Sequence, residues 1–252
     1  LLNLIRQGHK VAICEQLEKL EEAKKRGYKS VVKRDVVRLV TPGTITEESL
    51  LDGKKNNYLL AYCEDQVNAA AAWADLSTGE FSTSTIKKEN LDSLISRIDP
   101  TEILVSKKLT LALTEGYNES GSKVTILAES EFDHNVAKIK LEKLYSSKFQ
   151  KKLKSFNTLE LKAVGGLISY LEITQCGEIP TLKAPVKDNF DTFMQIEGAT
   201  RRNLELTQSL SGCKSGSLLD TINQTLTGGG SRLLERRLNC PLVNLDEINH
   251  RL

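Results

Sequence analysis

A stretch of small and β-branched residues at positions 67–86 constrains the fold more than any other part of the sequence. It reads VNAAAAWADLSTGEFSTSTI. Alanine, serine and threonine fill two arms of strand length, which the turn sequence Leu-Ser-Thr-Gly at 76–79 separates. Gly79 supplies the backbone freedom that a tight turn often needs. The stretch therefore predicts a β-hairpin around which the rest of the chain is organised.

Apolar periodicity around this hairpin indicates further strands and helices. A helix is expected at 91–98 and ends at Pro100, and two more are expected at roughly 133–154 and 158–172. The pair Gly165-Gly166 costs about 1 kcal/mol per glycine relative to alanine, which indicates close packing of the last helix. Three strands followed by helix, strand and helix predict a small α/β domain with a mixed sheet. The remaining strands are expected at 58–62, 103–105 and 124–127, with a polar loop at 114–123.

The regions on either side of this domain differ from it in pattern. On the N-terminal side we expect the end of a helix and then a strand at 10–14. A charged helix at 17–27, a strand at 31–40 and a polar linker or short helix at 46–57 follow. After a proline-containing extended connection at 179–190, the sequence predicts helices at 204–210, 217–226, 231–238 and at the end of the chain. Asn244 followed by Glu247 predicts the cap of that last helix.

Composition excludes several classes of protein. The net charge is only +2, so an affinity for nucleic acid would have to come from local clusters of basic residues. The five cysteines include no C-x-x-C pair, which argues against a disulfide framework and a zinc site and favours a reducing, cytoplasmic setting. The longest apolar runs fall short of the roughly 20 residues that a membrane span needs. Since Met194 is the only methionine, we expect the chain to be a piece of a longer protein.

Four sequence segments, taken in order, resemble the MutS family of DNA mismatch-repair proteins. They are VAICEQ at 11–16, VVKRDVVRLVTPGT at 31–44, ADLSTGEF at 74–81 and ATRRNLELTQSL at 199–210, and the tail at 217–252 continues the resemblance. Each segment alone is a weak signal, whereas their succession over nearly the whole chain is specific. Two local departures are the run Gly228-Gly229-Gly230-Ser231, where many members of the family have a methionine before the glycine, and Arg237, where many have tryptophan.

The resemblance implies a fold and a domain organisation. The fold class would be α/β plus all-α. Residues 1–44 would be the end of the mismatch-binding domain, 45–52 a linker, 53–175 a connector domain with an RNase H-like α/β fold, and 176–252 the start of a helical core or lever domain. The whole protein would be a bacterial, cytoplasmic and nucleoid-associated homodimer that binds mismatched double-stranded DNA, uses ATP and Mg²⁺, and recruits MutL.

Two functional motifs of the family do not occur in this sequence. No Phe-x-Glu stands near the N-terminus to wedge an aromatic ring into a base stack. The string Gly-Cys-Lys-Ser at 212–215 resembles the end of a phosphate-binding G-x-x-x-x-G-K-[ST] loop, but Thr207 stands where that motif requires glycine. We therefore expect this piece to have no catalytic residues and no cofactor, and to serve as the connector that transmits state between domains and docks MutL.

Asp75 allows a different interpretation, because RNase H-like nucleases hold a metal ion with an aspartate at the end of such a strand. Two-metal chemistry needs several acidic side chains close together. The sequence could supply them from Glu80, Glu102 and Asp133 if the sheet brings their strands together. The Leu-Ser-Thr-Gly that follows is instead a turn composition in which aspartate caps backbone N–H groups. The turn interpretation is favoured, and metal-dependent cleavage abolished by Asp75→Asn would indicate the nuclease.

A lysine-rich run at 138–154 and a set of arginines are the candidates for contact with the DNA backbone. The run predicts an amphipathic helix whose cationic face is either solvated or follows phosphates, and in the second case the piece would be a non-specific DNA-binding module. The arginines suit phosphates and also internal carboxylates. Gly228 to Gly230 are interpreted as a loop between helices, with anion binding at a helix N-terminus as the alternative. The candidate residues are Lys148, Lys151, Lys152, Lys154, Arg201, Arg202, Arg232 and Arg236.

The remaining residues with distinctive chemistry have simpler interpretations. His9, His134 and His250 have no motif-like spacing to a cysteine, so no metal site is predicted. Trp73, in the first arm of the hairpin, is expected in the core.

Overall fold

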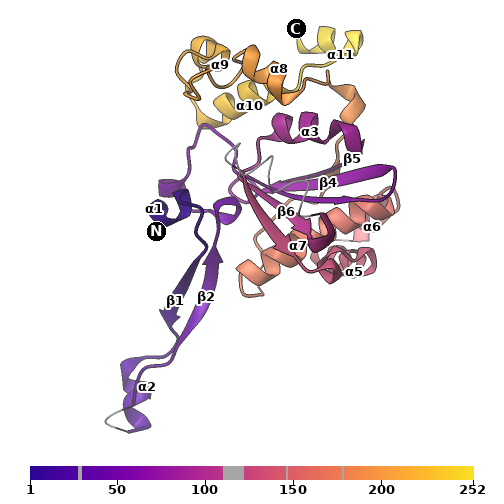
Figure 1. Cartoon of the computed structure of the whole chain (residues 1–252). Coiled ribbons are helices and arrows are strands. Elements are labelled where there is room, and N and C mark those ends of the chain that lie inside the picture. Colours follow the sequence, from indigo (N-terminus) through magenta and orange to yellow (C-terminus); the bar gives the residue numbers. More distant parts are fainter. Residues whose placement is uncertain (28–29, 110–121, 146, 178) are drawn as a thin grey trace.

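The computed structural model describes residues 1–27, 30–109, 122–145, 147–177 and 179–252. Figure 1 shows a β-ribbon that projects from one side, a layered α/β body, and a group of helices that lies over the body at the C-terminal end. Of the predicted polar loop at 114–123, residues 114–121 lie outside the described residues. The observed order, mixed α/β structure followed by helices, agrees with the predicted order of elements.

A six-stranded mixed sheet forms the centre of the body. Its order is β7-β6-β3-β4-β5-β8, and the two pairings within β3-β4-β5 are antiparallel while the other three are parallel. The predicted hairpin is confirmed: Asp75 pairs with Glu80 across the turn, and Gly79 takes a φ of +70° that side chains disfavour. The strands are β3 (Tyr58–Glu64), β4 (Asn68–Asp75), β5 (Glu80–Lys87), β6 (Glu102–Ser106), β7 (Lys123–Leu127) and β8 (Val186–Lys187).

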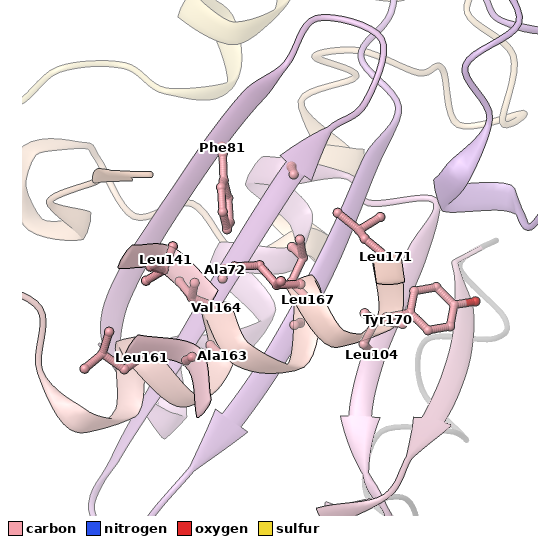
Figure 2. Packing of buried hydrophobic residues seen from close by; sticks show 14 of the residues in the cluster. Ala72, Phe81, Leu104, Leu141, Leu161, Ala163, Val164, Leu167, Tyr170 and Leu171 are labelled. Atoms are coloured by element: carbon pink, nitrogen blue, oxygen red, sulfur yellow. The ribbon is translucent and has the colours of Figure 1, made fainter. Parts of the chain in front are cut away.

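The sheet is buried on both faces. Alternate residues of each strand point to opposite sides and so join different apolar clusters. On β4, Ala70, Ala72 and Ala74 join one apolar cluster, whereas Ala69, Ala71 and Trp73 join the other. The first cluster is covered by α5 (His134–Leu144), α6 (Ser147–Leu153) and α7 (Thr158–Thr174), and the second by α3 (Leu91–Ile98). Figure 2 shows α7 lying across the first face, with its leucines against Ala72, Phe81 and Leu104.

The close approach of α7 explains its two glycines. A Cβ atom added to Gly166 would lie 2.5 Å from the Phe132 ring, and one on Gly165 would lie 3.0 Å from the Ala137 Cβ. Alanines on β4 remove bulk from the opposite side of the same helix. The predicted close packing at Gly165-Gly166 is therefore confirmed.

The prediction of one helix over 133–154 is wrong. Tyr145 ends α5 with an extended backbone, at φ −120° and ψ 154°, and α6 begins at Ser147. The Tyr145 ring packs on Phe149 with 5.1 Å between centroids, and its hydroxyl donates a hydrogen bond to the Lys183 carbonyl at 3.1 Å. The bond to a residue distant in sequence favours the break, which local periodicity does not reveal.

The N-terminal part is an antiparallel ribbon attached to the body at one end. Helix α1 (Leu2–Arg6) precedes β1 (Val11–Gln16), and α2 (Leu20–Lys25) lies at the far tip before β2 (Arg34–Val40) returns. A small apolar cluster around Ile5, Val40 and Ile45 forms the base of the ribbon. Short 3₁₀ turns occupy Pro42–Thr44, Glu48–Leu50, Lys88–Asn90, Lys107–Leu109, Glu129–Phe132 and Phe190–Thr192.

The C-terminal part is helical, with two differences from the prediction. It contains α8 (Gly198–Asn203), α9 (Leu218–Ile222), α10 (Gly228–Asn239) and α11 (Leu245–Arg251). The helix predicted at 204–210 is absent from this described segment, because Glu205 takes a φ of +48° and its carboxylate accepts a hydrogen bond from the Leu210 N–H. Gly228 to Gly230 are the first turn of α10 and not a loop. The Asn244 cap of α11 is confirmed by bonds from two backbone N–H groups.

Gly166→Ala should destabilise the protein by about 1–2 kcal/mol, because displacement of the Phe132 ring outweighs the gain in helix propensity. Urea unfolding followed by circular dichroism measures the difference. Gly229→Ala in α10 is the matched control, since its added Cβ would meet only the Arg232 guanidinium at 4.0 Å. Equal stability of the two variants would contradict the packing argument.

Candidate functional site at the buried Glu102 junction

A fully buried carboxylate joins the N-terminal part to the α/β body. Glu102, at the start of β6, has no solvent-exposed surface. One carboxylate oxygen accepts hydrogen bonds from the Thr41 hydroxyl at 2.5 Å and the Gly43 N–H at 3.0 Å. The other accepts from the hydroxyls of Thr125 and Tyr170, each at 2.7 Å. Four donors from β7, α7 and the 41–44 turn thus converge on one side chain.

The sequence Thr-Pro-Gly-Thr at 41–44 shapes the turn that reaches Glu102. The Thr41 N–H donates to the Thr44 hydroxyl at 2.9 Å, and Pro42 opens the 3₁₀ turn. A Cβ on Gly43 would lie 2.8 Å from both the Glu102 Cβ and a methyl carbon of Leu59. Only glycine therefore allows the backbone N–H at this position to approach the carboxylate.

The four donors to the Glu102 carboxylate are neutral: three hydroxyl groups and one backbone N–H. Among the described residues, no basic side chain pairs with it. Burial, together with the neighbouring Glu102 charge, raises the pKa of the Tyr170 hydroxyl, which keeps it protonated as a donor. The ammonium of Lys10, from the start of the ribbon, lies 5.5 Å from the centre of the Tyr170 ring. The Lys10 contact thus attaches the N-terminal part to α7, while the bonds from Thr41 and Gly43 to Glu102 attach it to the sheet.

A second junction fastens the C-terminal helices to the opposite face of the sheet. Arg97 of α3 is 6% exposed and donates to the Asp188 carboxylate at 2.6 Å. Its guanidinium lies 5.0–5.8 Å from the ring centres of Trp73, Phe190 and Phe193. This cluster holds the segment after β8 against α3.

An ion pair on the same side of the body links α10 to the hairpin. Arg236 pairs with Glu80 at 3.0 Å, and the other Glu80 oxygen accepts from the Tyr58 hydroxyl at 3.1 Å. Burial and the Glu80 charge raise the pKa of Tyr58, so this hydroxyl also remains a donor. Through Glu80, α10 is thus connected to the first residues of β5 and β3.

The structure gives Asp75 the role of a turn residue. Its carboxylate is fully buried and accepts hydrogen bonds from the backbone of Asn57, from the backbone and hydroxyl of Ser77, and from the backbone of Thr78. Its oxygens are therefore committed to the hairpin turn and to the chain entering β3.

The acids that could have completed a nuclease site do not form one with Asp75, although Glu80 is its register partner. Glu80 is bonded to Tyr58 and Arg236, Glu102 to the four donors described above, and Asp133 caps α5 through the N–H groups of residues 135 and 136. In the part of the chain that the structure describes, no three His, Cys, Asp or Glu side chains are arranged to hold a metal ion. The geometry therefore does not favour the nuclease interpretation.

The candidates for DNA contact do not form one surface. Lys151, Lys152 and Lys154 are exposed at the end of α6, on the face of the sheet that α7 covers. The candidate arginines belong to α8 and α10, over the other face, as Figure 1 shows. The side chain of Lys148 lies outside the described residues. The two groups thus lie on opposite sides of the sheet.

Three of the candidate arginines have partners within the protein. Arg201 is 7% exposed and donates to the Ile196 carbonyl and to two oxygens of Asn239, so burial removes it from the candidates for DNA contact. Arg232 donates to the Gly53 carbonyl, and Arg236 pairs with Glu80. Arg202 remains exposed.

Comparison with known proteins assigns the three parts to successive domains of one family. Residues 57–183 match the family model for MutS domain II, residues 1–49 match MutS domain I, and residues 199–252 match MutS domain III. The chain belongs to the MutS family. The Glu102 hydrogen bonds to Thr41 and Gly43 therefore cross from the match to domain II into the match to domain I.

The MutS relatives are similar along the whole chain. It is 49% identical to the DNA mismatch repair protein MutS of Ruegeria pomeroyi, 48% to that of a second Ruegeria strain and 46% to that of Paracoccus denitrificans, over 100% of this chain in each case. The chain spans 28–29% of the length of these relatives. Within the described residues, no helix is long and apolar enough to cross a membrane.

Sequence reasoning identifies Glu102 only as a possible metal ligand beside Asp75 and misses its role at the junction. A signal is present, since a glutamate that opens the apolar run Ile-Leu-Val at 103–105 is unusual in a buried strand. Its partners, however, lie 23 to 68 positions away in sequence, and local pattern does not identify them.

Glu102→Gln should lower the free energy of unfolding by about 3 kcal/mol, because an amide nitrogen replaces one of two acceptor oxygens and leaves buried donors unsatisfied. Tyr170→Phe, which removes one donor, should cost about 1 kcal/mol. Urea unfolding measures both. Glu129→Gln, at an exposed glutamate, is the control and should stay within about 0.5 kcal/mol of the parent protein. A Glu102→Gln variant as stable as this control would contradict the assignment.

Proposed function

We propose that this chain is the connecting part of a DNA mismatch-repair MutS protein. It would hold the mismatch-binding domain and the helical core in fixed positions on a central α/β domain and transmit displacements between them. The observation that supports this most directly is the Glu102 carboxylate, whose donors come from the matches to two different domains of the family. The role is mechanical and needs no chemistry within the chain.

Several features of the whole protein accompany this proposal. The connector would have an RNase H-like fold, which is supported by the antiparallel β3-β4-β5 meander with β6 and β7 added in parallel to the side of β3. The domain boundaries at 44, 52 and 175 remain predictions. The whole protein would act in the bacterial cytoplasm as an ATP- and Mg²⁺-dependent homodimeric clamp on mismatched DNA, and the exposed surface of the connector would dock MutL.

Mechanical coupling through Glu102 can be tested by a double-mutant cycle. Thr41→Val and Tyr170→Phe each remove one donor, on opposite sides of the carboxylate. If Glu102 couples the two domains, the stability changes should differ from additivity by about 0.5–3 kcal/mol. Urea unfolding of the parent, the two single variants and the double variant gives the coupling energy.

A matched cycle provides the control. Thr41→Val combined with Gly166→Ala pairs the same junction residue with a site on α7 whose added Cβ would meet Phe132 and not Glu102. This cycle should be additive within about 0.3–0.5 kcal/mol. Additivity in both cycles would exclude Glu102 as the coupling element.

Non-specific DNA binding at the end of α6 is a second candidate function, because Lys151, Lys152 and the following Lys154 are exposed while Leu153 is buried. Native-gel titration with matched and G·T-mismatched duplexes in Mg²⁺, at two salt concentrations, tests it. We expect weak, salt-sensitive binding that is equal for the two duplexes, with no shortening of the DNA. Reversal of all three lysine charges to glutamate should reduce the salt slope by about 0.9 for each phosphate that is no longer neutralised.

The control for this titration is a variant with the same change in charge elsewhere. Lys24→Glu, Lys25→Glu and Lys54→Glu lie on exposed positions outside α6 and should alter the salt slope less. A clear preference for the mismatched duplex would contradict the connector role, and shortened DNA would restore Asp75 as a catalytic candidate. Equal salt slopes for the two charge variants would exclude α6 as the site.

A further inference from the structure

A cavity of about 480 Å³ lies between the sheet and the C-terminal helices. Its walls come from β3, β4 and β5, from the end of α3, and from α10. This volume is within the range of small-molecule sites, which occur preferentially where two domains meet. Neither Glu102 nor any of its four hydrogen-bond donors lines the cavity, so it is a separate site from the Glu102 junction.

The lining of this cavity is cationic. Eight basic and four acidic described residues line it. Three of the acids are already paired with lining cations: Asp99 with Lys55 at 2.6 Å, Asp188 with Arg97 at 2.6 Å, and Glu80 with Arg236 at 3.0 Å. Burial raises the pKa of the fourth, Glu235, so its negative charge is disfavoured.

In the described part of the chain, four lining cations remain without an acidic partner, and one of them, Arg232, donates instead to the Gly53 carbonyl. Among the described residues, Lys183, Arg237 and Arg251 form no ion pair, and all three are exposed at the rim of the cavity. Deeper in the same site, Arg97 is 6% exposed and its Nε has no hydrogen-bond partner among the described residues. A cavity with unpaired cations at its rim and an unsatisfied buried guanidinium nitrogen suits an anionic ligand.

The cavity also has a surface for a planar ring. Tyr58, Trp73 and Phe193 line it together with the aliphatic side chain of Leu233. Tyr58 and Trp73 are 8% and 6% exposed and Arg97 lies over one face of Phe193, so the half-buried Phe193 ring is the aromatic surface most open to a stacked heterocyclic base. Inorganic phosphate would occupy only a small part of 480 Å³ and would leave this wall uncovered.

We propose that this cavity binds a nucleoside phosphate, with the phosphate at the rim cations and the base against the aromatic wall. The inference does not depend on the proposed connector role. A ligand in this position would contact both the sheet and α10, and it would stabilise the docked arrangement of the C-terminal helices by mass action.

Trp73 makes the test specific, because it is the only tryptophan in the chain and it lines the cavity. Titration of the 252-residue chain with AMP, followed by Trp73 emission excited at the red edge, should give a saturable change with a midpoint below about 1 mM. Adenosine and inorganic phosphate, titrated separately, should each bind at least about tenfold more weakly, since each lacks half of the interactions.

Arg237→Gln should weaken AMP binding about tenfold, because it removes one charge-assisted hydrogen bond to the phosphate. Arg202→Gln is the matched control, an exposed arginine that does not line the cavity, and it should leave the midpoint unchanged. Near-ultraviolet circular dichroism establishes that both variants are folded, and Arg251→Gln provides a second rim variant. Four results would each overturn the proposal: no saturable change, adenosine binding as tightly as AMP, phosphate binding as tightly as AMP, or equal midpoints for Arg237→Gln and Arg202→Gln.

Discussion

The arrangement of the first two parts of the chain depends on a charge held without water. Transfer of a carboxylate into a protein interior costs several kcal/mol unless hydrogen bonds replace its hydration. Glu102 receives four such bonds, and two of them come from the 41–44 turn. If the turn moved away, Glu102 would lose two of its four hydrogen bonds while still buried, which is unfavourable. The ribbon is therefore attached at one defined position, although its contact with the body is small.

The sheet that carries Glu102 is built to be covered on both faces. Small residues on β4 let α7 lie close on one side, where Gly166 meets the Phe132 ring, while Trp73 fills the other side beneath α3. Burial of both faces makes the sheet a rigid element, because its strands cannot shift register without moving apolar side chains between the two clusters. A rigid sheet is suited to holding attached parts at a fixed separation.

Much of this architecture follows from local sequence pattern. The hairpin, the helix at 91–98 and the cap at Asn244 are determined by neighbours in sequence, and local pattern predicts all three. The break at Tyr145 and the burial of Arg201 depend on distant partners such as Lys183 and Asn239, and pattern alone does not reveal them. The same holds for the site: a glutamate in a buried strand is visible in the sequence, whereas the four donors that define its role are brought together only by the fold.

The Glu102 junction and the Tyr58–Glu80–Arg236 contacts lie at the same end of the β3–β6 strand pair, so the path between them runs through the sheet. Glu102 is the register partner of Leu59, and the residue before it, Tyr58, donates to Glu80, which pairs with Arg236 of α10. Contacts are therefore continuous from the 41–44 turn, through β6 and β3, to the C-terminal helices. Each step along this path is a hydrogen bond, an ion pair or a strand pairing, as the proposed mechanical role requires. The coupling energy across Glu102 therefore distinguishes a sheet that connects the two parts from one that only supports them.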